Sequence, residues 1–464
     1  MVEPTFGAPA DFAAVRSFLS DQGYTAQAVS ARVGVRAIHQ FKPRRDGRTV
    51  GVELEDTLDL LIRLFMDAEV LPWATVRGRL PAPVVDALGG LGLLMQAAST
   101  PDGCHATALL YPTEGLFIVS DLTADPDPAA AVPLAKDVVY PAITLSSQRF
   151  LAMMPRTPCE RFLELCAGTG IAALAAAGTA GHVWAADITD RATRFARFNA
   201  ALNGIANFTA VQGDLYQPVA GQSFDRIVAH PPYVPAVEQR FIFRDGGADG
   251  EQITRGVLGG LAGALAPGGR FHGTCVLSDR NDARLEARVR GMLGVQEGEF
   301  DVLVGTMFEY EPADYFTRIA LDGRARFEDM EPTLRVMHDL GVERLVYSHI
   351  EIQRRAAPRP VFTRRRQFAA ANGPTEVDWL LGWESTALDP AAVEQLLHRP
   401  ARVNPRTAVQ VTLRPDGPDR WSQTESAATV DWPFPLRAKL PPWGADLLAR
   451  CDGSTALGAL LAGL

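Results

Sequence analysis

Four short runs in the sequence combine turn-forming residues with side chains that bind ligands. The first, Gly168-Thr-Gly170, follows an apolar run and precedes an alanine-rich one. Because glycine lacks a Cβ, a ligand can press against the backbone there and meet the N–H groups of the next helix. The other runs are Asp187, Gly213-Asp214 and His230-Pro-Pro-Tyr233. A glycine turn followed by a carboxylate that can hold ribose hydroxyls is typical of a nucleotide-type pocket.

Each of these runs ends a predicted strand. We expect the first strand to begin at Phe162 and the next three to cover 182–187, 208–214 and 224–229, the last stopped by two prolines that cannot donate to a sheet ladder. Open α/β sheets bind ligands at the carboxyl ends of their parallel strands, so the four loops are expected to meet at one edge.

The segment 139–366 resembles the class I S-adenosylmethionine-dependent methyltransferases and, within them, the release-factor glutamine and N6-adenine methyltransferases. The matching pieces are Glu164-x-Cys-x-Gly-Thr-Gly170, Asp187, Gly213-Asp214, Pro231-Pro-Tyr233, Asp245-Gly-Gly-Ala-Asp-Gly250 and Ala266-Pro-Gly-Gly269. The resemblance implies a doubly wound Rossmann-like sheet in the α/β class, with S-adenosyl-L-methionine as cofactor. His230 departs from the family, which usually has Asn or Asp at this position.

The resemblance also implies a set of cofactor-binding residues. Gly168 and Gly170 would approach the methionine part, with Glu164 near its ammonium group. Asp187 would accept hydrogen bonds from the ribose hydroxyls, and Asp214 would contact the adenine amino group. The other positions expected in this site are Cys166, Ile188, Leu215 and His230. The alternative for both aspartates is a carboxylate on a surface turn.

The loop 230–233 is expected to hold the methyl acceptor, which makes His230, Pro231 and Tyr233 the candidate catalytic residues. In the family, the first side chain and the first proline carbonyl accept hydrogen bonds from a planar NH₂ group, and the tyrosine stacks on it. A neutral imidazole offers one acceptor nitrogen and an imidazolium none, but imidazole can also remove a proton. We therefore expect activity to require neutral His230 and the acceptor to differ from a simple amide.

The approach segment 137–155 precedes the first of these strands. In the related enzymes such a segment covers the cofactor, a role that Thr144, Ser146 and Ser147 would take here. An ordinary helix cap explains these hydroxyls equally well.

Composition limits the remaining possibilities. The 464 residues contain 47% hydrophobic and 21% charged residues, as in ordinary multidomain globular proteins. A net charge of −9 argues against a broad nucleic-acid-binding surface. The five cysteines form no C-x-x-C pair, which predicts reduced thiols and no bound metal. The first ten residues do not resemble a signal peptide, and the apolar run 257–265 is too short to span a bilayer, so we expect a cytoplasmic protein without membrane association.

Four regions are predicted: a winged-helix-like N-terminal domain at 1–122, a proline-rich linker at 123–136, the methyltransferase domain at 137–366 and a small α+β C-terminal domain at 367–464. Helices followed by a hairpin at 105–120 suggest the winged helix, although no basic cluster marks a helix for a DNA groove. Beyond residue 233, we expect helices near 250–265 and 281–293, strands at 270–276, 299–304 and 315–321, and a helix and strand within 327–353.

The arginines between 354 and 366 form a basic run: Arg354, Arg355, Arg359, Arg364, Arg365 and Arg366. The run is interpreted either as a solvated face or as a phosphate-contacting surface.

We therefore predict a methyltransferase that acts on a nitrogen, or another heteroatom, of a protein, peptide or biosynthetic small molecule. One alternative is a nucleic-acid (adenine-type) N-methyltransferase that extracts a base into the same pocket, with the arginine run lining the path to Tyr233. The other is a cofactor-binding scaffold with a degenerate site.

Overall fold

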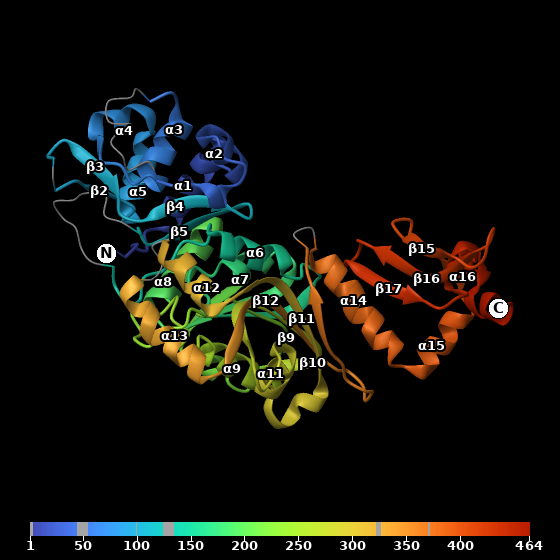
Figure 1. Ribbon diagram of the computed structural model, residues 1–464. Helices are drawn as coiled ribbons and strands as arrows, with labels where there is room; N and C mark the ends of the chain where they lie inside the picture. The colour runs from blue at the N-terminus through green and yellow to red at the C-terminus, as the bar shows by residue number, and fades with distance from the viewer. Residues whose placement is uncertain (1–2, 44–53, 99, 124–133, 322–325, 370–371) are drawn as a thin grey trace.

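The computed structural model describes residues 3–43, 54–98, 100–123, 134–321, 326–369 and 372–464. Its centre is an eight-stranded mixed sheet with the order β13-β11-β12-β10-β9-β6-β7-β8 (Figure 1). Five neighbouring strands are parallel: β6 (Cys159–Leu165), β7 (Ala180–Asp187), β8 (Phe208–Gln212), β9 (Phe224–Ala229) and β10 (Leu265–Arg280). Strand β12 (Val342–Arg354) runs antiparallel between β10 and β11 (Phe300–Tyr310), and β13 (Thr363–Gln367) lies parallel to β11. The predicted Rossmann-like sheet is confirmed.

Helices cover both faces of this sheet because its strands alternate their side chains between two cores. Phe162 and Val183 belong to the core that contains α7 (Ile171–Ala176) and α8 (Asp190–Asn203). Leu163 and Ala186 belong to the opposite core, with α9 (Gln252–Gly259), α10 (Leu261–Ala264) and α11 (Leu285–Met292). The strand order reverses between β6 and β9, so a crevice forms at their carboxyl ends.

The N-terminal region consists of helices and short strands above α8 (Figure 1). Its elements are α1 (Pro9–Asp21), α2 (Ala26–Val33), η1 (Ile38–Gln40), α3 (Thr57–Leu61), η2 (Ile62–Met66), β1 (Leu71–Pro72), α4 (Trp73–Arg79), α5 (Ala82–Gly90), β2 (Leu94–Gln96), β3 (Gly103–Ala106), β4 (Leu109–Thr113) and β5 (Leu116–Ser120). The predicted hairpin is formed by β4 and β5. It begins later than expected, because residues 103–106 pair with β1 and β2 in a separate sheet. The winged-helix assignment and the domain boundaries stay predictions, and linker residues 124–133 lie outside the described residues.

Two asparagines of α8 attach this region to the central sheet. Asn199 accepts a hydrogen bond from the N–H of Val119 at 2.8 Å and donates to its carbonyl at 3.0 Å. One turn later, Asn203 accepts from the N–H of Phe117 at 2.9 Å and donates to its carbonyl at 2.7 Å. The two side-chain amides thus pair with backbone N–H and C=O groups on the edge of β5 that faces α8.

One predicted strand is wrong. Residues 315–321 lie in helix α12 (Pro312–Leu321), which precedes η6 (Phe327–Asp329) and α13 (Met330–Asp339). The apolar residues Tyr315, Phe316, Ile319 and Ala320 are buried, with the spacing of one helical face. A short apolar run fits either period, and only the packing of this face against β12 decides between them.

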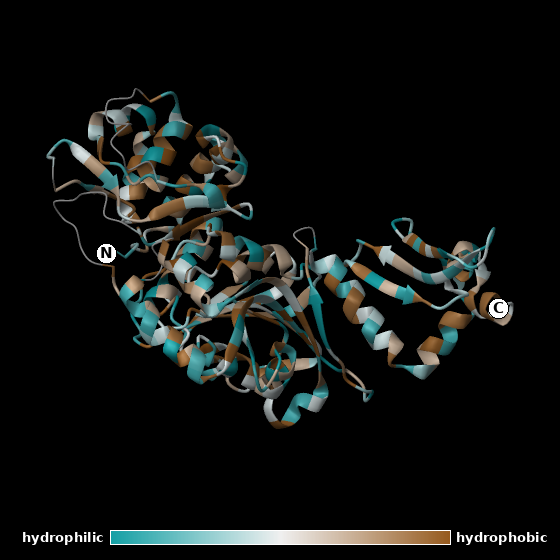
Figure 2. Cartoon of the chain, in the orientation of Figure 1, coloured by the Kyte–Doolittle hydropathy of each residue, from teal (hydrophilic) through white to brown (hydrophobic). Residues whose placement is uncertain are grey.

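The C-terminal region is attached through α14 (Pro374–Ala387). Hydrophobic and hydrophilic residues alternate along this helix (Figure 2), and its Val377, Leu380 and Leu381 pack with Phe368 and Phe434. The remaining elements are α6 (Leu145–Met153), which precedes β6, the short helices η4 (Gln217–Val219) and η5 (Gly294–Glu299), and α15 (Pro390–Leu397), β14 (Pro400–Arg402), β15 (Ala408–Pro415), β16 (Trp421–Val430), β17 (Leu436–Leu440), α16 (Gly444–Arg450), β18 (Asp452–Ala456) and α17 (Leu457–Ala462). None of the helices in the described residues has the length and apolar character needed to cross a bilayer.

Candidate active site

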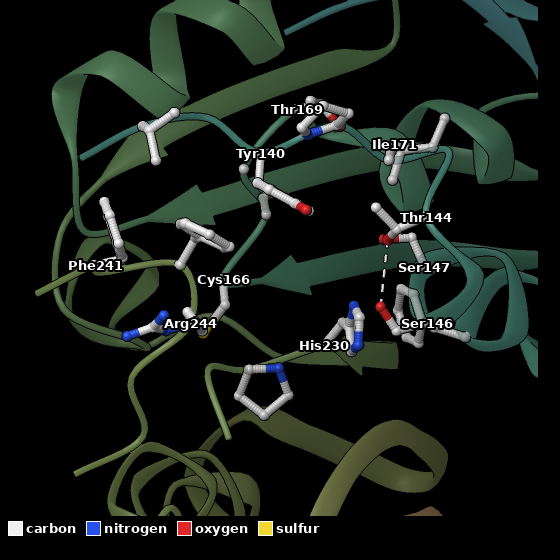
Figure 3. A pocket seen from close by; sticks show the side chains of 18 of the residues that line it. Tyr140, Thr144, Ser146, Ser147, Cys166, Thr169, Ile171, His230, Phe241 and Arg244 are labelled. Carbon is white, nitrogen blue, oxygen red and sulfur yellow. Dashed lines mark hydrogen bonds between the residues drawn. The ribbon is translucent and has the colours of Figure 1, made fainter. Parts of the chain in front are cut away.

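Two adjoining cavities, of about 360 and about 280 Å³, lie at the carboxyl ends of β6, β7, β8 and β9. They share Cys166, Gly168 and His230 as lining residues, together with Tyr140 and Phe243. Figure 3 shows Tyr140, Cys166 and His230 around the larger cavity. The two cavities therefore form one crevice, with His230 at the junction.

The crevice brings together most of the residues predicted from the sequence. The larger cavity is lined by Glu164, Pro231 and Tyr233, and the smaller one by Asp187, Ile188, Asp214 and Leu215. Gly170 does not line either cavity. It has φ +76°, and a Cβ there would lie 3.0 Å from the Cβ of Ala196 in α8, so it allows the turn to pack on that helix.

The glycine turn leaves space where a ligand would lie. Gly168 has φ +52°, and a Cβ added there would have no atom within 4 Å. Two residues that line the smaller cavity, Cys166 (φ +55°) and Leu215 (φ +47°), also adopt the left-handed conformation although they are not glycines. Such a conformation costs about 1–2 kcal/mol per residue and is common at ligand sites.

Asp187 ties the end of β7 to the glycine turn. One carboxylate oxygen accepts a hydrogen bond from the N–H of Gly168 at 2.9 Å, and the other accepts from the N–H of Thr189 at 3.0 Å. Burial raises the pKa of Asp187. The oxygen bonded to the Thr189 N–H also accepts from the Thr189 hydroxyl at 3.2 Å, so the oxygen bonded to Gly168 keeps a second lone pair for a donor in the crevice.

Glu164 fixes the first turn of α7. It is 3% exposed, and its oxygens accept hydrogen bonds from the N–H groups of Ala172 at 3.2 Å and Ala173 at 2.8 Å. Burial raises its pKa to about 8. A cation beside this carboxylate would stabilise its ionised form.

His230 presents an unsatisfied nitrogen to the junction. Its Nε2 is buried and has no hydrogen-bond partner among the described residues. The ring stacks on Phe150 at 5.3 Å, and Tyr233 lies 5.7 Å away on another side. Burial, together with His272, lowers the pKa of His230 to about 4, so its imidazole is neutral near pH 7.

A second buried imidazole, that of His272, lies behind His230. His272 stacks on the other face of Phe150 at 5.4 Å. Its Nδ1 lies 2.6 Å from Oε1 of Glu351, and its Nε2 lies 3.2 Å from the Phe150 carbonyl. Both ring nitrogens of His272 therefore lie within hydrogen-bond distance of an oxygen atom.

The lowered pKa of His230 predicts an acid-sensitive stability. In the unfolded chain the ring titrates near its ordinary value of 6.5, so the folded state loses stability as the pH falls from about 6.5 to about 4. At 1.36 kcal/mol per pH unit, this loss amounts to at most about 3 kcal/mol. Urea unfolding at several pH values should show a shallower loss for His230→Asn than for the native protein. Parallel curves for the two proteins would contradict this origin of the acid sensitivity.

Aromatic residues that sequence reasoning missed cover the crevice. Tyr140 and Phe243 stack at 4.5 Å with an interplanar angle of 6°, and the N–H of Ile242 donates to the carbonyl of Lys136 at 2.9 Å. These contacts join two segments about a hundred residues apart, so no local pattern in the sequence marks them. The aromatic spacing of Phe241 and Phe243 was the only signal present.

The hydroxyls of Thr144, Ser146 and Ser147 all line the larger cavity (Figure 3). The oxygen of Thr144 lies 3.3 Å from that of Ser146 and 3.1 Å from that of Ser147. Thr144 precedes α6 but makes no capping hydrogen bond to its backbone. The position over the cavity therefore describes these residues better than a helix cap does.

Five of the six arginines in the run pair with carboxylates of the chain. Arg354 pairs with Glu299 at 2.7 Å, Arg359 with Asp301, and Arg365 with Asp279 at 2.9 Å. Arg364 and Arg366 both pair with Glu384 of α14, and Arg355 donates to the carbonyl of Gly298. Most of the charge of the run is thus paired by residues from elements distant in sequence, and the side chains of Arg364 and Arg366 stay 42% and 41% exposed. Among the residues the structure describes, no group of three or more His, Cys, Asp or Glu side chains is placed to hold a metal.

Comparisons with known proteins agree with this architecture. Residues 141–272 match the family model of the methyltransferase small domain. The chain is 37% identical over 128 residues to the release factor glutamine methyltransferase of Moorella thermoacetica, covering 24% of this chain and 45% of that protein. It is 34% identical over 127 residues to the ribosomal protein uL3 glutamine methyltransferase of Bradyrhizobium diazoefficiens, covering 24% and 40%. It is 31% identical over 193 residues to the release factor glutamine methyltransferase of Deinococcus radiodurans, covering 35% and 68%.

The chain belongs to the class I S-adenosylmethionine-dependent methyltransferases, in the group that contains the release factor glutamine methyltransferases. It spans less than half the length of the first two relatives above. The crevice fits the cofactor of this family: it has open space above Gly168, a carboxylate at Asp187 and apolar walls at Ile188, Leu215 and Ile253.

Proposed function

We propose that the protein transfers a methyl group from S-adenosylmethionine to a nitrogen, or another heteroatom, of a protein, peptide or biosynthetic small molecule held by His230-Pro-Pro-Tyr233. The observation that carries the proposal is the position of His230, whose unsatisfied Nε2 lies where the two cavities join. The names of the relatives favour a protein acceptor, since they act on release factors and ribosomal protein uL3.

The smaller cavity would hold the adenosine part of the cofactor. Asp187 would accept hydrogen bonds from the ribose hydroxyls, and Asp214 would contact the adenine amino group. The apolar side chains of Ile188 and Leu215 would pack on the adenine ring. Glu164 would pair with the ammonium group from beside the larger cavity. The bound cofactor supplies an electrophilic methyl group for an in-line displacement.

The loop 230–233 would orient the acceptor. With the proton on Nδ1, the Nε2 of His230 offers a lone pair to an N–H of the acceptor, and the carbonyl of Pro231 offers a second. These contacts would turn the lone pair of the acceptor nitrogen toward the methyl group, with Tyr233 packed on the planar group. A neutral His230 is also able to take the proton that the nitrogen releases.

The raised pKa of Glu164 predicts pH-dependent cofactor binding. Because the uncharged carboxyl group must ionise to pair with an ammonium group, affinity should increase about tenfold between pH 6 and pH 7. Calorimetry in two buffers of different ionisation enthalpy should show proton release on binding. Glu164→Gln should bind more weakly, without proton release. A native affinity that does not change with pH would argue against this role for Glu164.

The proposed function is tested by two measurements on the full chain. Calorimetry should show one binding site for S-adenosylmethionine or its demethylated product, and isotope-labelled cofactor should pass its methyl group to protein or peptide acceptors. Cofactor binding without transfer to any acceptor would support the scaffold alternative. Transfer to single-stranded nucleic acid alone would support the nucleic-acid alternative. That alternative requires the arginine run to contact phosphates, whereas most of these arginines form ion pairs with carboxylates of the chain.

A further inference from the structure

An aromatic surface continues from the acceptor loop onto strands β12 and β11. Tyr347 lies edge-on to Tyr233 with ring centroids 6.4 Å apart, and Phe308 lies 6.4 Å beyond Tyr347. Tyr310 stacks 6.4 Å from Phe308 at an interplanar angle of 24°. Tyr347, Phe308 and Tyr310 are here called the aromatic wall. Phe308 is 37% exposed, whereas Tyr347 is buried, so the wall reaches the protein surface at Phe308.

Two guanidinium groups rest on the faces of these rings. The Cζ atom of Arg149, from α6, lies 4.7 Å from the ring centre of Phe308 and 5.7 Å from that of Tyr347. The Cζ atom of Arg318, from α12, lies 5.2 Å from the ring centre of Tyr310. Stacking uses the flat face of a guanidinium and leaves the N–H donors along its edge available for a planar anion.

Both positive charges are uncompensated in the described part of the chain. Neither Arg149 nor Arg318 makes a hydrogen bond or ion pair there, although Arg149 is half-buried. The carboxylates on and just beyond β11 have other partners, since Glu309 pairs with Arg365 at 2.7 Å and Glu311 with Arg344 at 3.2 Å. A partly desolvated guanidinium without an acceptor is unfavourable, and an anionic ligand removes that cost.

Each arginine is next in sequence to a residue of the site. Arg149 precedes Phe150, which stacks on His230 and lines the larger cavity. Arg318 precedes Ile319, which lines the same cavity. Helices α6 and α12 therefore each carry one arginine of the aromatic wall and one residue that lines the larger cavity.

We propose that the acceptor is a protein segment that carries a carboxylate close to the methylated residue, and that Arg149 binds this carboxylate while the aromatic wall packs against the segment. The inference rests on the proposed function and names its substrate class. A peptide fits better than a nucleic acid because the aromatic wall carries two guanidinium groups, whereas the chain has a net charge of −9 and most of its arginine run is paired internally. A polynucleotide needs a longer track of positive charge.

The test uses two degenerate peptide libraries of equal length, one with Asp or Glu and the other with Asn or Gln at the positions flanking the centre. Transfer from labelled S-adenosylmethionine should favour the acidic library by about tenfold or more in kcat/KM, since only the acidic peptides form a charge-assisted hydrogen bond with Arg149. Arg149→Ala should remove this preference, chiefly through KM, and Arg149→Lys should restore part of it. Fluorescence anisotropy with labelled acidic peptides and the demethylated cofactor should show the same loss of affinity.

The matched control is Arg77→Ala, which removes a guanidinium stacked 4.8 Å over Trp73 in helix α4 of the N-terminal region and lining neither cavity. It should leave transfer to both libraries unchanged. All variants should bind the cofactor with native affinity.

The outcomes separate the two proposals. Absence of cofactor binding would contradict the proposed function itself. Native cofactor binding with equal transfer to both libraries, with no acidic peptide bound, or with no effect of Arg149→Ala would overturn the inference alone. An Arg149-dependent preference for a single-stranded oligoribonucleotide would also overturn it, in favour of a nucleic-acid acceptor.

Discussion

Replacing Asp187 with alanine should weaken the binding of S-adenosylmethionine by about 100-fold or more. The substitution removes the acceptors proposed for the ribose hydroxyls, and each hydrogen bond to a charged group is worth about 1.5–3 kcal/mol. It also releases the N–H groups of Gly168 and Thr189, which hold the glycine turn in place. Calorimetry on the full chain measures the effect.

The control for this variant is Asp190→Ala. Asp190 is the first residue of α8, three positions further along, and its side chain is exposed. The control should bind the cofactor with native affinity, because Asp190 does not line the crevice. Equal affinities for Asp187→Ala and the native protein would mean that the ribose does not lie at the end of β7.

Replacing His230 with alanine should lower kcat by about 100-fold or more while the cofactor affinity stays close to native. The loss follows from the removal of the only side-chain acceptor proposed for the reacting group, and general-base or oriented hydrogen-bonding groups are typically worth 10²–10⁴-fold. Single-turnover transfer to the best acceptor separates this loss from changes in binding. Undiminished turnover would exclude His230 from the reaction.

A second substitution at this position distinguishes between two roles for the ring. Asparagine offers a carbonyl acceptor but does not take a proton, so His230→Asn should keep much of the rate if hydrogen bonding suffices and lose as much as alanine if proton removal is required. His182→Ala serves as the control. His182 contacts Thr209 at 2.9 Å and does not line the crevice.

The pH profile of the native protein depends on the burial of His230. An exposed imidazole would titrate near pH 6.5 and give a profile that changes between pH 5 and 8. With its pKa lowered to about 4, the ring stays neutral through that range. Its titration should therefore appear only as a fall in kcat/KM toward pH 4. Activity is still expected to require neutral His230, but this requirement must be tested near pH 4 and not between pH 5 and 8.

The parallel strands and the loops at their ends were predictable because both faces of these strands are buried. Such strands produce continuous apolar runs, and the polar residues that interrupt them, as at Asp187 and Gly213-Asp214, mark the edge where ligands bind. The prediction was wrong at 315–321, where a short apolar run fits a strand and a helix equally well.

Other features of the site depend on contacts between distant segments. The stack of Tyr140 on Phe243 and the pairing of Arg364 with Glu384 join residues whose neighbours in sequence do not reveal the partner. The neutral state of His230 depends on burial and on His272, a residue of strand β10 that is separated from His230 by the ring of Phe150. The sequence alone does not predict these contacts, because each of them forms only when distant segments pack together.

The hydrogen bonds of Asn199 and Asn203 to β5 hold the N-terminal region against α8 and oppose a hinge motion between them. Separating it from α8 would leave four backbone groups of Val119 and Phe117 without partners in an apolar interface. Because α8 begins three residues after Asp187, the N-terminal region also stabilises the helix that follows the proposed ribose site. A partner protein that binds the N-terminal region would therefore be held at a constant distance and orientation relative to the methyl-transfer site.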